Sequence, residues 1–214
     1  SLRDIYSKFL PEIISLSNKF GQSKIIYNSL VKLKETNNFD QIKNRILEKE
    51  ILEMQHRGIS LLKNDQEEFN NISEKLGKLT TDFSNNVLDA TNHWILILNK
   101  KSEVDGLPER VLEMMAISAH NHLKKEGEVD IKNGPWKLSL DIPTYTSFMT
   151  YATDRNLREK LYKAFVGRAS QGEKNNSQII EEILSLRTKK ANLLGYKSWA
   201  ELSLSTKMAK EIKN

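Results

Sequence analysis

The 214-residue chain contains no cysteine, which excludes disulfide bonds, thiolate zinc fingers and thiol catalysis. It also lacks any hydrophobic run close to the roughly 20 residues that span a bilayer, so we predict no membrane partner. The first residues, SLRDIYSKFL, have neither an initiator Met nor a signal-peptide layout, and the last residues follow a helical pattern without a stop signal. We therefore expect both ends to lie within a longer protein.

Positive charge is in modest excess and is dispersed along the chain. Lys and Arg number 33 against 28 Asp and Glu, which gives a net charge of +5. Only short lysine clusters occur, such as Lys124–Lys125 and Lys189–Lys190. A nucleic-acid-binding surface requires a concentrated basic stripe, so this pattern predicts a solvated surface and no nucleic-acid partner.

Glycine and proline are scarce, with nine and four residues, and β-branched runs are few. This composition predicts an all-α fold that is mostly helical. From Asp65 onward, apolar residues recur at spacings of three and four, which predicts one long helix with a single apolar stripe. The stripe consists of Phe69, Ile72, Leu76, Leu79, Phe83, Val87, Ala90, Trp94 and Ile97. Asp65 is placed to cap this helix, with Glu68 as the third residue beyond it.

Shorter helices are predicted before and after the long one. Their approximate ranges are 1–17, 23–36, 40–57, 108–126, 154–170, 177–194 and 198–210. Gly58 and Gly195 are placed to end two of these helices, because glycine readily adopts the left-handed conformation found after a helix. Ser198 and Glu201 are placed to cap the last one.

One segment alternates with the period of a β-strand. Trp136, Leu138, Leu140 and Ile142 are separated by single polar residues. The pattern predicts a small β-element over 136–142 with one face on the core, and the sequence shows no partner for it. Pro143 ends this element and can open a short helix to about Tyr151.

The stretch SNNVLDATNHW, residues 84–94, concentrates polar side chains on the predicted long helix. Asp89 and His93 are four residues apart, so they share a helix face and could hydrogen-bond or offer two metal ligands. The sequence indicates no third ligand nearby. His120 and His122 point in different directions, and His56 stands alone. The alternative to a metal site is a polar helix face that contacts a neighbouring helix or solvent.

No complete active-site motif occurs in the chain. None of the four histidines is followed by Glu, so the zinc-protease pattern H-E-x-x-H is absent, and so is the G-x-S-x-G elbow. An aromatic-rich zone, with arginines nearby, could form a peptide-binding wall or could belong to the core. It comprises Tyr145, Phe148, Tyr151, Tyr162, Phe165, Arg155, Arg158 and Arg168.

Several long segments resemble the oligopeptidase A branch of the thimet oligopeptidase family, peptidase family M3. They are KLTTDFSNNVLDATNHW, WKLSLDIPTYTSFMTYATDRNLREKLYKAFVGRAS, NNSQIIEEILSLRTKKANLLGYKSWAELSLSTKMA and GQSKIIYNSL, and they occur in the family's order over nearly the whole chain. The resemblance implies part of a two-lobed, almost wholly helical fold that flanks a deep channel. It implies that residues 1–150 form the N-terminal helical domain and that residues 151–214 begin the peptidase domain.

The resemblance also implies a function for the parent protein. Members of this family are zinc-dependent endopeptidases that cut short unfolded peptides, and they hold zinc on an H-E-x-x-H helix and a downstream Glu. That segment lies beyond the matched region, so we expect no catalytic or metal-binding residue in this chain, no zinc bound by it and no activity of the chain alone. Asn86 and Asp89 are candidate contacts to the peptide backbone in the channel wall.

A second hypothesis is a stand-alone, non-catalytic helical module that binds extended peptides or a partner protein in an apolar groove. Peptide binding by the isolated chain would favour it. The resemblance is compatible with a cytoplasmic location, or with a mitochondrion or plastid in a eukaryote. Oligomeric state is left open by the sequence.

Overall fold

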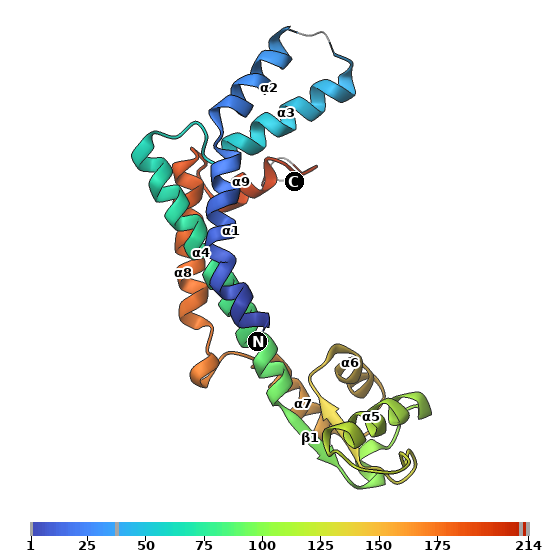
Figure 1. The fold of residues 1–214 in the computed structure, drawn as a ribbon. Helices are drawn as coiled ribbons and strands as arrows, with labels where there is room; N and C mark the ends of the chain where they lie inside the picture. Colours follow the sequence, from blue (N-terminus) through green and yellow to red (C-terminus); the bar gives the residue numbers. More distant parts are fainter. Residues whose placement is uncertain (1, 37–38, 210–211, 213–214) are drawn as a thin grey trace. The chain divides into compact units, whose positions relative to one another are not determined.

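The computed structural model describes residues 2–36, 39–209 and 212. Most of these residues lie in helices, as predicted, and among them a pair of short strands forms one small sheet (Figure 1). The chain divides into two compact units. The first holds Ser1–Asp82 and Gln178–Asn214, and the second holds Phe83–Ser177.

The first unit is entirely helical over its described residues. It contains α1 (Leu2–Gly21), α2 (Lys24–Thr36), α3 (Gln41–His56), the first part of α4 (Lys63–His93), nearly all of α8 (Ser177–Leu193) and α9 (Trp199–Leu204). Helices α2 and α3 lie side by side, and α1 runs along α4 and α8 (Figure 1). Segments far apart in the sequence therefore build this unit together.

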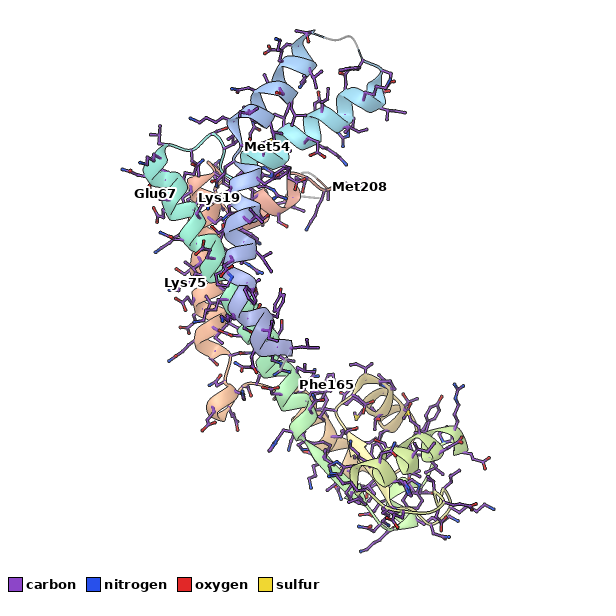
Figure 2. The ribbon with its side chains drawn as sticks, in the orientation of Figure 1. Lys19, Met54, Glu67, Lys75, Phe165 and Met208 are labelled. Carbon is purple, nitrogen blue, oxygen red and sulfur yellow. The ribbon has the colours of Figure 1, made fainter. Side chains whose placement is uncertain are left out.

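Apolar burial and one close approach hold the helices of the first unit together. Phe69 and Ile72 of α4 and Ile183 of α8 are buried, and such burial is the main favourable term in helix packing. Lys75 of α4, labelled in Figure 2, pairs with Glu182 of α8. Gly77 leaves room for Ile14 of α1, whose side chain occupies the space that a Cβ would need.

The helix ends of this unit follow the predicted glycine and serine signals. Gly58 and Gly195 have φ values of 84° and 81°, the left-handed conformation that favours glycine. The residue after each glycine donates its N–H back into the helix, as in a Schellman motif. Ser198 caps α9 by accepting from the Glu201 N–H at 3.2 Å, while the Glu201 carboxylate accepts from the Lys197 N–H. These predictions are confirmed.

The second unit packs helices on a two-stranded antiparallel sheet. It contains the end of α4, β1 (Ile95–Leu98), η1 (Lys101–Val104), α5 (Glu109–His122), β2 (Trp136–Ser139), α6 (Ile142–Tyr151), α7 (Arg155–Val166) and η2 (Gly172–Lys174). In the sheet Ile95 lies opposite Ser139 and Leu98 opposite Trp136. The core around it includes Leu98, Met115, Trp136, Leu138, Phe148 and Leu161, each at most 1% exposed.

The structure corrects the predicted long helix at both ends. Helix α4 begins at Lys63, so Asp65 lies inside its first turn and is not the cap. It ends at His93, so Trp94 and Ile97 are not helical. Residues 95–98 form the strand that pairs with β2, the partner that the sequence did not reveal. The apolar spacing continued the helical period only by coincidence. This segment forms a strand because its backbone pairs with β2 and because Leu98 is buried in the core.

Four other predicted ranges are too long. The strand ends at Ser139, because Asp141 caps α6 by accepting from the Thr144 N–H, and Ile142 is therefore helical and exposed. Helix α5 ends at His122 and α7 at Val166. Helix α9 ends at Leu204 and not near 210, a position that lies outside the described residues. Leu202 is buried, whereas Met208 is fully exposed.

Candidate functional site

A cavity of about 840 Å³ in the second unit is lined by the last part of the polar stretch singled out in the sequence. One side of it is the last turns of α4, with Asp89, Ala90 and His93. The other side is the end of α7 and the segment 167–174. Asp89 and His93 thus line one cavity, as their spacing of four on a helix predicts, while Asn86 lies about one turn before Asp89.

The carboxylate of Asp89 has a cationic partner inside this cavity. Lys174 Nζ lies 3.1 Å from Asp89 Oδ2, and both residues line the cavity. The pair is partly exposed, so its contribution to stability is small, at most about 1 kcal/mol. It does place a carboxylate and an ammonium group side by side at the cavity wall.

Asn86 takes part in a buried amide contact. Its Nδ2 donates to Asn176 Oδ1 at 2.9 Å, and Asn176 Nδ2 donates to the Phe83 carbonyl at 3.1 Å. Asn176 is only 3% exposed, and its own N–H donates to the Ala169 carbonyl at 2.8 Å. Since buried polar groups are costly unless hydrogen-bonded, these contacts fix the segment 167–177 against α4.

Arg168 joins the aromatic zone to the same wall. Its guanidinium lies 3.6 Å from the centre of the Phe165 ring, and that ring stacks on Tyr145 with centroids 3.8 Å apart. Arg168 also donates to the Phe165 carbonyl and to Thr91 Oγ1. Stacking and hydrogen bonding hold the guanidinium in one orientation at the cavity.

The two interpretations of the aromatic zone each apply to some of its residues. Phe148 is fully buried and belongs to the core of the second unit, and Tyr145 and Phe165 pack against that core. Tyr151 and Tyr162 are half exposed. Arg168 alone among the three arginines lines the cavity.

Within the described residues no group of three or more His, Asp or Glu side chains is placed to hold a metal ion. Among these residues the Asp89–His93 pair has no third ligand of the kind that a metal site needs, and Asp89 is paired with Lys174. His56 belongs to the first unit, where its Nε2 lies 2.7 Å from the Tyr196 hydroxyl. Burial lowers the pKa of His56, against an opposing effect of Glu53.

Lys190 of the first unit is partly buried. Its Nζ donates to Ser73 Oγ at 2.9 Å and lies 4.4 Å from the centre of the Phe69 ring. Burial, with a smaller effect of Arg57, lowers its pKa to about 8. Ser73 in turn donates to the Phe69 carbonyl, so its hydroxyl is held in the helix and is not a free nucleophile.

Sequence reasoning did not find that Lys174 and Arg168 line the cavity, or that Asn176 holds the adjoining segment against α4. Lys174 and Asn176 lie about 90 residues along the chain from their partners Asp89 and Asn86 in α4, and no local pattern links them. A usable signal was the run of polar residues and glycines between Gly167 and Ser177, which marks a loop that must satisfy its own backbone groups.

Two family models match the chain. The model for the N-terminal domain of neurolysin and thimet oligopeptidase matches residues 1–67, and the model for peptidase family M3 matches residues 148–214. Both matches agree with the mostly helical fold. Among the described residues, no helix is long and apolar enough to cross a membrane. The chain belongs to peptidase family M3.

Within that family the chain is similar to proteins named oligopeptidase A. The probable cytosolic oligopeptidase A of Arabidopsis thaliana is 40% identical over 211 residues, which are 97% of this chain and 30% of that protein. The organellar oligopeptidase A, chloroplastic/mitochondrial, of the same plant is 39% identical over 97% of this chain and 26% of that protein. Oligopeptidase A of Escherichia coli (strain K12) is 33% identical over 97% of this chain and 30% of that protein. The chain thus spans less than a third of the length of these relatives.

Proposed function

We propose that this chain is the N-terminal part of a zinc-dependent oligopeptidase that hydrolyses short, unfolded peptides. The observation that carries the proposal is the 33–40% identity to proteins named oligopeptidase A across 97% of the chain. In this proposal residues 1–150 form the N-terminal helical domain, and residues 151–214 begin the peptidase domain. The chain would supply a channel wall that binds and orients the peptide.

The described residues do not form a zinc site. The described residues of the chain include no cluster of three possible ligands, and Asp89 is committed to Lys174. We therefore assign the metal to the region of the longer protein outside these 214 residues.

Hydrolysis of an unstructured peptide by two proteins tests the proposal. The full-length protein should cleave the peptide and should lose activity on treatment with a zinc chelator. The 214-residue chain should cleave nothing, with or without added zinc. Cleavage by the 214-residue chain alone, or a full-length protein indifferent to chelation, would contradict the proposal.

We further propose that Asn86 and Asp89 contact the peptide backbone at this wall. Asp89 lines the cavity and presents carboxylate oxygens, which accept hydrogen bonds from backbone N–H groups. In the full-length enzyme, Asp89→Ala and Asn86→Ala are each expected to raise KM by about three- to tenfold with little change in kcat, as loss of uniform binding does.

Lys174→Met is the matched control for Asp89, because it breaks the same ion pair and leaves the carboxylate in place. A rise in KM for Asp89→Ala but not for Lys174→Met would support a direct contact. Equal effects of the two substitutions would show that the ion pair matters for structure only. An unchanged KM in both alanine variants would remove the proposed contact.

The names of two relatives bear on the cellular compartment. Relatives carry the words cytosolic and chloroplastic/mitochondrial in their names. We propose that the protein works in the cytoplasm or inside one of these organelles, where short peptides accumulate as products of other proteases. Fractionation of the source cells, with detection of the full-length protein, tests this.

A further inference from the structure

Helix α1 carries large apolar side chains on two faces. On one face Ile14 packs against Gly77 of α4, and Ile14 and Leu10 are partly buried. On another face six apolar side chains are between 45% and 86% exposed. They are Leu2, Tyr6, Phe9, Ile13, Leu16 and Phe20, and we call them the α1 stripe. Figure 2 shows side chains of α1 that project away from the packed helices α4 and α8.

The α1 stripe has the periodicity of a helix-packing seam. Its members follow one another at spacings of four, three, four, three and four residues. Such a 3.5-residue period keeps apolar side chains facing one partner helix over several turns. The stripe runs for about 27 Å at 1.5 Å per residue, long enough for a partner helix of average length or more. Solvated monomers rarely leave so long an apolar band uncovered.

A cavity of about 350 Å³ lies beside the stripe. It is lined by Pro11, Glu12, Leu16 and Lys19 of α1 together with Glu74 of α4. Leu16 belongs both to the stripe and to this cavity. A partner helix lying along the stripe could insert a side chain between α1 and α4 at this point.

We propose that the α1 stripe is covered by a helix from the remainder of the same polypeptide, and this inference rests on the proposed function. The chain spans 26–30% of the length of its oligopeptidase A relatives, so most of a protein of that kind lies outside it. Helices α8 and α9 belong to the region matched by the peptidase family model and lie in the same unit as α1. In a protein of that kind, helices that continue the peptidase region would start from the unit that presents the stripe.

A second copy of the chain fits the stripe less well. In an antiparallel pair of two stripes, the flanking Glu12 of one copy meets Glu12 of the other. Like charges at flanking positions disfavour such a pairing. A helix in cis also carries no concentration-dependent cost of association.

Hydrogen exchange of the full-length protein tests the proposal. The stripe variant carries Phe9→Gln and Leu16→Gln, and the control carries Ser7→Gln and Lys8→Gln at exposed polar positions of the same helix that neither belong to the stripe nor line the cavity. In the wild type, α1 amides should exchange at least tenfold more slowly than in the 214-residue chain. The stripe variant should lose this protection in α1 and in one segment beyond residue 214, whereas the control should keep both.

The outcomes distinguish docking in cis, pairing of two copies and failure of the proposed function. Equal exchange in the stripe variant and the control would overturn the proposal, and protection that rises with protein concentration, with a dimeric mass, would assign the stripe to a second copy. Peptide hydrolysis is measured on the same wild-type sample. Active protein with an uncovered stripe would refute the docking alone, and inactive protein with a covered stripe would refute the proposed function alone.

Discussion

At the residue scale, two glycines with positive φ differ in how closely other atoms approach them. Gly106 has a φ of 85°, and a Cβ there would collide with the Tyr151 carbonyl. Gly127 has a similar φ of 91° but open space around it. An alanine at Gly127 would therefore meet only backbone strain, whereas an alanine at Gly106 would meet backbone strain and a steric clash.

Gly106→Ala is expected to destabilise the protein by about 3 kcal/mol or more, because strain of order 1–3 kcal/mol is joined by a backbone clash that cannot relax cheaply. Gly127→Ala should cost about 1 kcal/mol, since only the left-handed conformation is penalised. Urea unfolding of both variants measures the difference. Equal losses in the two variants would show that the close approach of Gly106 to Tyr151 has no energetic effect.

Lys190 should make stability depend on pH above neutrality. Its pKa is lowered from 10.5 to about 8 in the folded protein. Between these values the unfolded chain binds a proton that the folded chain has released, so stability rises with pH from about 8 to about 10.5. Lys190→Met should lack this rise, and exposed Lys189→Met should keep it. Parallel pH profiles for the wild type and Lys190→Met, from urea midpoints at pH 7 to 10, would contradict the expectation.

At the scale of elements, strand β1 decides how the second unit is built. If residues 95–98 continued α4, Ile97 would face the core as part of the long stripe. In the strand Leu98 is 1% exposed, and Ile97 is only partly buried. Pairing with β2 has thus replaced the helical pattern over these four residues.

Leu98→Ala is expected to cost about 2–5 kcal/mol, the range for deleting a large buried aliphatic side chain. Ile97→Ala should cost clearly less, because its side chain is not fully removed from water. Thermal unfolding monitored in the near-ultraviolet, where buried Trp136 reports, compares the two variants. A larger loss for Ile97→Ala would restore the helical interpretation of this segment.

At the scale of the whole molecule, the exposed α1 stripe predicts different surface behaviour for the short and the long protein. The isolated 214-residue chain should enhance the fluorescence of a hydrophobic dye severalfold over the full-length protein at equal molar concentration, because apolar patches of this size bind such probes. Phe9→Gln with Leu16→Gln should lower the signal of the short chain. Equal fluorescence of the two wild-type proteins would mean that the stripe stays exposed in both.

Much of the helical architecture followed from local patterns. Period and composition located the helices, and Gly58, Gly195 and Ser198 marked their ends correctly, because capping is decided by a few neighbouring backbone groups. The polar stretch of α4 was also visible, with Asp89 and His93 on one cavity wall. Whether Asn86 and Asp89 touch a peptide stays a prediction.

What the sequence alone determined, then, is the class of fold, the family and the local helix signals, because these depend on short-range spacing and on long runs of similar residues. The tertiary structure decided the rest. Pairing with β2 turned Ile95–Leu98 into a strand, and the segment 167–177 brought Lys174 and Asn176 to α4. These outcomes depend on burial and hydrogen bonds between residues about 40 to 90 positions apart, and no local period records such contacts.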